Sequence, residues 1–155
     1  MFEVPIDALY VWVGTALASV AALGVALSLT TAPPPDAAAA ADTVDAVAGA
    51  DHDATGVHPV DATSVKISAH SLALRDDGGM ARERFAFGPV TPVREDSKLA
   101  RVARGTPPSE AFTDPSALAR AAREARRMPA SWERTDRLRV RTVVWGDVRV
   151  TLVDA

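Results

Sequence analysis

The chain has 155 residues, no cysteine and a formal net charge of −3. This length leaves room for one small domain beside one short additional segment, and the lack of cysteine excludes disulfide bonds and thiol chemistry. The charge is uneven: residues 1–61 contain eight acidic and no basic residues, whereas residues 62–155 contain seventeen basic and twelve acidic residues.

A long apolar segment near the start of the chain predicts a transmembrane helix. The segment from Ala8 to Leu29 contains 22 residues and no charge. At about 1.5 Å per residue it would be about 33 Å long, which matches the roughly 30 Å hydrocarbon core of a bilayer. A cleaved secretion signal would need a basic start, and Met1–Asp7 carries only acidic charge. We therefore predict a single-pass anchor at residues 1–31.

Small residues recur at every fourth position of this predicted helix. Such a face lets a second helix approach closely, which favours association in lipid. An alanine-rich composition would place small residues there without any such role. The predicted transmembrane packing face, which would contact other membrane helices in a homo- or hetero-oligomer, consists of Gly14, Ala18, Ala22 and Ala26.

Residues 32–62 predict a Pro-rich spacer followed by an Ala/Asp-rich stalk or loop. Three consecutive prolines, Pro33–Pro35, end the predicted helix and favour an extended spacer. Asp36–Ala50 is nearly all Ala, Asp and Val, so it offers little apolar face and predicts a marginal helix or stalk. Asp51–Asp61 contains a glycine, a proline and two histidines, which is typical of a loop.

A first β-hairpin is predicted at the start of a small domain at residues 63–155. Apolar residues alternate from Val65 to Leu74, with a slip of phase at Ala69–Ser71. The turn sequence Asp76–Gly79 follows, and a second strand should then run from about Met80 to Phe87. Gly88-Pro89 ends that strand, since proline cannot donate a ladder hydrogen bond.

Two helices and a second hairpin complete a predicted ββααββ order and an α+β fold class. The expected helices run from Asp96 or Ser97 to Arg104 and from Asp114 to Arg127, and the expected strands are Arg137–Trp145 and Val148–Val153. The turn at Gly146-Asp147 sets Trp145 opposite Val148, so we expect Trp145 in the core. Both faces of this hairpin are apolar, and therefore helices or a neighbouring molecule should cover both.

No motif in the sequence carries enzyme chemistry. His52 lies between Asp51 and Asp53, but three contiguous residues in a loop do not provide the fixed geometry of a metal site. The serines occur in no G-x-S-x-G motif. We therefore expect no enzyme activity, no catalytic residue, no cofactor and no metal.

Arginine is concentrated in the last third of the chain. An arginine surface suits an anionic lipid, a nucleic acid or an acidic protein partner. Nucleic acid is not expected, because Trp132 is the single aromatic residue available for stacking within the run. A solvated surface and a contact with the acidic stalk of a neighbouring subunit are the alternatives. The possible anionic-partner patch comprises Arg120, Arg123, Arg126, Arg127, Arg137, Arg139 and Arg141.

Three segments carry a resemblance to a known family: MFEVPIDALYVWVGTALASVAALGVALSL, TTAPPPDAAAAADTVDAVA and RDDGGMARERFAFGPVTPV. They resemble an uncharacterised family of small haloarchaeal single-pass membrane proteins associated with type IV pilus or Tad-like gene clusters. The resemblance covers roughly the first 93 residues and implies a pilin-like or accessory component. No basic residue and glycine precede Ile6, unlike the processing site of type IV prepilins, so cleavage by a prepilin peptidase is not expected.

These patterns together predict a membrane-anchored structural or assembly protein whose function is contact. Its partners would be the lipid bilayer and other membrane helices, and its domain at residues 63–155 would lie outside the cell. The alternative is a membrane-tethered domain that faces the cytoplasm and uses its arginine surface to bind an anionic partner.

Overall fold

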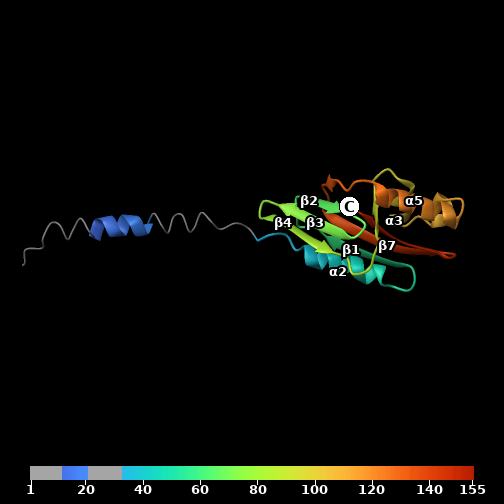
Figure 1. Ribbon diagram of the computed structural model, residues 1–155, viewed down its shortest axis with the longest axis horizontal. Helices are drawn as coiled ribbons and strands as arrows, with labels where there is room; N and C mark the ends of the chain where they lie inside the picture. The colour runs from blue at the N-terminus through green and yellow to red at the C-terminus, as the bar shows by residue number, and fades with distance from the viewer. Residues whose placement is uncertain (1–11, 21–32) are drawn as a thin grey trace, which may run out of the picture. The chain divides into compact units, whose positions relative to one another are not determined.

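The computed structural model describes residues 12–20 and 33–155. The chain divides into two compact units, Met1–Ala32 and Pro33–Ala155. In the first unit, residues 12–20 form a helix whose side chains are all exposed. The second unit holds both sheets and the remaining helices (Figure 1).

The structure contradicts the predicted transmembrane helix. Among residues 12–20 and 33–155, no helix combines the length and the apolar character of a membrane span. The fold class is therefore corrected to an α+β protein with two β-sheets. Ala22, Ala26 and the rest of the predicted span lie outside the described residues.

The second unit contains two four-stranded sheets and four helices within residues 33–155. Sheet A has the strand order β1-β7-β8-β5, in which β5 and β8 are parallel, and sheet B has the antiparallel order β4-β3-β2-β6. In chain order the elements are α2 (Ala37–Ala48), β1 (Ala54–Pro59), β2 (Ser64–Ile67), β3 (Ser71–Asp76), β4 (Gly79–Arg84), β5 (Thr91–Val93), α3 (Lys98–Ala103), α4 (Pro108–Ala111), α5 (Pro115–Arg127), β6 (Trp132–Glu133), β7 (Arg137–Trp145) and β8 (Val148–Asp154).

The Ala-rich segment is a core helix and not a stalk. The Asp36 carboxylate caps α2 by accepting the Ala39 N–H at 3.0 Å. α2 packs against strands of both sheets, and the missing side chain of Gly56 in β1 allows a close approach: a Cβ added there would lie 2.8 Å from Val47 Cγ2. Val44 is completely buried in this core. The folded unit therefore begins near Pro33 and not at residue 63.

Polar side chains of sheet A also hold the C-terminal end of α2. The Thr142 hydroxyl donates to the Val47 carbonyl oxygen at 2.9 Å, and Arg149 Nη2 donates to the Ala48 carbonyl oxygen at 2.7 Å. The last carbonyl groups of a helix have no partner within the helix. These bonds give the Ala48 carbonyl a donor and give the Val47 carbonyl a second one beside the Ala50 N–H. They attach α2 to the strands at the end opposite its Asp36 cap.

The segment predicted as a loop at residues 51–61 contains strand β1. It pairs antiparallel with β7, from Ala54 opposite Thr142 to Pro59 opposite Arg137. Its side chains are alternately half-buried and exposed, and Pro59 stands at its last position, where a missing N–H does least harm to the ladder. Pairing with a distant strand thus overrides the local turn signals.

The first predicted hairpin is confirmed at its turn and corrected in its first strand. β3 and β4 pair around Asp77-Gly78, and the Asp76 carboxylate accepts the Gly78 N–H at 2.7 Å. The expected first strand is two antiparallel strands, β2 and β3. The slip of phase marks the turn between them, where the Ser68 hydroxyl donates to the Ser71 carbonyl oxygen.

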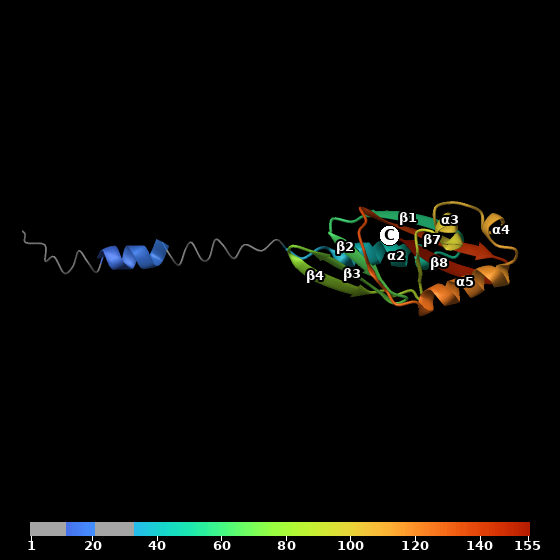
Figure 2. The same ribbon diagram turned by 90° about the horizontal axis from the view of Figure 1, so that it is seen from above.

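The second hairpin and its two helices are confirmed. Trp145 pairs with Val148 and Val143 pairs with Val150, as expected from the Gly146-Asp147 turn. α2 covers one face of sheet A, whereas α3, α4 and α5 cover the other (Figures 1 and 2). A hydrophobic core lies between sheet A and the helices α3, α4 and α5, and we call it the second core. Trp145 is only half-buried at its edge, which corrects the predicted place of Trp145 in the interior.

Candidate functional site

The structure separates the arginines of the predicted patch. On β7, Arg141 is used within the fold, because its Nη1 donates to the carbonyl oxygens of Val102 at 2.6 Å and Thr106 at 3.2 Å. Arg137 pairs with its neighbour Asp136 at 3.0 Å. Arg141 and Arg139 therefore contact other parts of the fold, whereas Arg137 stays exposed on the surface.

A buried carboxylate near the end of the chain explains the position of Arg139. Asp154 is 5% exposed and accepts from Arg104 Nε at 2.9 Å, with Arg139 Nη1 at 3.8 Å. The hydrogen bond and the charge of Asp154 raise the pKa of the Arg104 guanidinium above its ordinary value. Because the Asp154 carboxylate is already paired with two cations, these three side chains stabilise the fold.

Arg126 also stabilises the fold, although it lies on the arginine-rich helix α5. Its Nε donates to the Thr91 hydroxyl at 2.9 Å, which joins α5 to β5. Burial lowers the pKa of this guanidinium, and the nearby positive charge of Arg123 lowers it further. Thr91 is completely buried, so the contact satisfies a polar group inside the core.

Three arginines of α5 remain exposed, and we call them the α5 arginine face: Arg120, Arg123 and Arg127. Their i, i+3, i+7 spacing places them on one side of the helix, because residues three and four apart are neighbours on a helix surface. Leu118 and Ala122 bury the opposite side. Within the described part of the chain, none of the three makes an ion pair or a side-chain hydrogen bond.

The start of α5 is well determined. The Asp114 carboxylate accepts the Ala117 N–H at 2.8 Å, and Pro115 occupies the first helical position. This backbone hydrogen bond, followed by that of the Thr113 hydroxyl, lowers the pKa of Asp114. The cap and the buried apolar side together fix the direction in which the α5 arginine face points.

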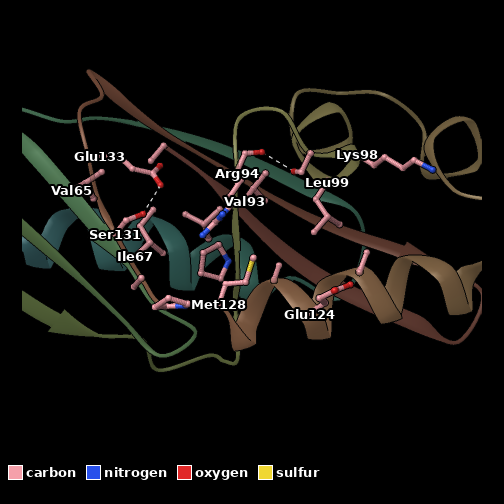
Figure 3. A pocket seen from close by; sticks show the side chains of 18 of the residues that line it. Val65, Ile67, Val93, Arg94, Lys98, Leu99, Glu124, Met128, Ser131 and Glu133 are labelled. Carbon is pink, nitrogen blue, oxygen red and sulfur yellow. Dashed lines mark hydrogen bonds between the residues drawn. The ribbon is translucent and has the colours of Figure 1, made fainter.

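An apolar cavity of about 310 Å³ lies beside the C-terminal half of α5 (Figure 3). We call it the α5 cavity. The side chains that form its walls come from both sheets, from α3 and α5 and from the loops between them: Val65, Ile67, Val93, Leu99, Phe112, Ala121, Ala125 and Val153. Met128, which is 47% exposed, forms a lip together with Pro129 and Ala130. Sequence reasoning missed this cavity.

Polar groups surround the mouth of the α5 cavity. The Ser131 hydroxyl donates to Glu133 Oε1 at 3.1 Å, so this carboxylate already has a partner. The Ser97 hydroxyl donates to the backbone carbonyl of Arg94 at 2.7 Å, whereas the Arg94 guanidinium has no hydrogen bond or ion pair to any other residue that the structure describes. A second, more polar hollow of about 500 Å³ adjoins the mouth and shares Arg94, Ser131 and Glu133 with it.

The histidine segment shows no metal-site geometry. His52 and its two neighbours are exposed, and the Asp53 carboxylate accepts the Val144 N–H at 2.6 Å. Over residues 12–20 and 33–155, no group of three or more His, Asp or Glu side chains is placed to hold a metal ion. Of the predicted helix-packing face, Gly14 and Ala18 are exposed on the helix at residues 12–20.

The fold and the cavity define a class of protein: a small α+β protein in which two sheets pack around one Ala-rich helix. The family whose description reads "Family of unknown function (DUF7283)" matches residues 3–143, so the chain belongs to this family. This agrees with the uncharacterised family expected from the three N-terminal segments. No curated protein and no solved structure is significantly similar to the chain.

Proposed function

We propose that the protein is a structural or assembly protein whose folded unit works by contact with a partner. The observation that carries the proposal is the α5 arginine face, which presents three exposed cations that make no ion pair and no side-chain hydrogen bond with another described residue. Three exposed arginines on a rigid helix, with one exposed acidic residue, Glu124, beside them, attract an acidic surface and orient it. A second copy of the chain offers such a surface.

Acidic side chains lie on the opposite side of sheet A. α2 exposes Asp36 and Asp42, and residues 33–61 contain no basic residue. Since α2 and α5 cover opposite faces of sheet A, the acidic side of one copy can meet the α5 arginine face of the next. A contact between two different surfaces is heterologous, and it extends from copy to copy unless it closes into a ring. This geometry supports an assembly role.

Charge reversal and rescue in the full-length protein test the contact. We expect sedimentation velocity to show concentration-dependent association that Arg123→Glu weakens and that Arg123→Glu combined with Asp42→Lys restores. Arg82→Glu is the matched control, because Arg82 is exposed on β4, away from α5. Association that ignores Arg123→Glu, or a protein that stays monomeric at every concentration, would overturn the proposal.

A more specific form of this proposal is that the protein has a pilin-like or accessory role in a haloarchaeal type IV pilus or secretion apparatus. Its support is the sequence resemblance over the first 93 residues. Deleting the gene should then reduce the number of pili on the cell surface, and complementation with the Arg123→Glu variant should fail to restore it. Normal piliation in the deletion strain would contradict the pilus assignment and leave the self-association experiment to stand by itself.

The alternative is a cytoplasm-facing domain that binds a different anionic partner. The same three exposed arginines favour it, because their contact surface does not depend on a second copy. A reporter fused after Ala155 separates the two readings: activity outside the cell favours the pilus-type assembly, and activity confined to the inside favours the alternative. The placement of the domain outside the cell stays a prediction until this measurement.

A further inference from the structure

We propose that the α5 cavity binds a small amphiphile with a compact apolar body and a carboxylate head group, and that Arg94 binds the carboxylate. This inference does not depend on the α5 arginine face. It rests on three properties of the cavity: its rigid apolar walls, its size, and a cation at its mouth that has no ion pair with another described residue.

The walls are rigid because they are part of the two hydrophobic cores. Leu99, Phe112 and Val93 belong to the core beneath α5, and Val65 and Ile67 belong to the core around α2. All five side chains are buried, and each is at most 9% exposed. A cavity with such walls is already formed before a ligand enters, so binding requires little ordering of the protein.

The size of the cavity indicates a ligand larger than a single ring. An apolar cavity of about 150 Å³ takes up benzene, and the α5 cavity has about 310 Å³. By that ratio it accommodates about twelve carbon atoms, as in a bicyclic aromatic group or a medium-length acyl chain. The exposed Met128 at the lip is flexible and polarisable, which suits an apolar ligand of variable shape.

The mouth of the α5 cavity carries charges of both signs. The Glu133 carboxylate accepts the Ser131 hydroxyl and keeps its negative charge, and Glu95 lines the adjoining hollow. In Figure 3 the Lys98 ammonium points away from the cavity, and Glu124 lies on the α5 side, at a distance from Arg94. Arg94 is the arginine that lines both the α5 cavity and the adjoining hollow, and its planar guanidinium can donate two parallel hydrogen bonds to a carboxylate.

The experiment uses the full-length protein, with decanoate and 1-decanol as probes in isothermal titration calorimetry. The two probes share their chain and differ in the head group. We expect saturable 1:1 binding of decanoate that Arg94→Gln weakens about tenfold or more, because a hydrogen-bonded ion pair is lost. Binding of 1-decanol should change little in this variant. Lys98→Gln is the matched control and should bind decanoate as the wild type does.

A second variant tests the apolar wall. Ala125→Leu adds volume inside the cavity and should weaken both probes, and Ala121→Leu replaces it if thermal melting shows that the first variant does not fold. Failure of the wild type to bind decanoate, or equal decanoate binding by Arg94→Gln, would overturn the proposal. Binding to phosphatidylcholine vesicles without binding of free decanoate would overturn it as well, since the site would then recognise a lipid surface.

Discussion

The substitution Val44→Ala tests whether α2 is part of the core. Val44 is completely buried between α2 and the two sheets. The change removes two methyl groups, worth about 0.8 kcal/mol each in transfer free energy, and leaves a cavity that adds to this cost. We expect the free energy of unfolding to fall by about 2 to 3 kcal/mol, which lowers Tm by about 6 to 15 °C in a unit of this size. Thermal melting followed by circular dichroism measures the shift.

The matched control for this experiment is Val57→Ala, which removes the same atoms from β1. Val57 is 60% exposed, so its truncation should change the free energy of unfolding by less than about 0.5 kcal/mol. If Val44→Ala melts at the wild-type temperature, α2 does not pack against the sheets in solution, and the interpretation of residues 37–48 as a stalk would be restored. Equal losses in both variants would also refute the reasoning.

Two further predictions concern the second core. Trp145→Ala should lower the free energy of unfolding by about 2 kcal/mol, because the ring is half-buried. Truncation of a fully buried Trp costs roughly 3 to 5 kcal/mol, so a loss of that size in thermal melting would place the ring in the interior. The lowered pKa of Asp114 means that its charged carboxylate stabilises the fold fully above the ordinary pKa of 3.8, and that this contribution disappears as the pH falls further through the folded-state pKa. Asp114→Ala should therefore be less stable than the wild type at about pH 6 and should lose less Tm between about pH 6 and about pH 3; an unchanged pH dependence would contradict this role of the cap.

Several elements are determined by signals that lie within a few residues of one another. Ser97 and Asp114 stand as N-caps at the starts of α3 and α5, where their side chains accept N–H groups of the first turn. Gly146 has a positive φ of 59°, which the two-residue turn between β7 and β8 requires. The register of that hairpin then follows, because the turn sets which residues face each other.

The candidate sites could not be predicted in the same way. The exposed arginines of α5 follow from helical spacing, but nothing local shows that Arg126 and Arg141 are used inside the fold, since their partners lie 35 or more residues away. The α5 cavity is even less accessible to sequence reasoning. Its walls combine β2, β5, α3 and α5, which meet only after folding.

The sequence by itself determined the turns, the helix caps and the periodic strands, because their free energy comes from contacts between near neighbours. The tertiary structure decided the rest. An Ala-rich segment with little apolar surface becomes a core helix because two sheets surround it, and a segment with Gly56 and Pro59 becomes a strand because β7 supplies its hydrogen bonds. Hydrophobic burial and strand pairing depend on residues far apart in the chain, so only the folded unit shows which surfaces remain free.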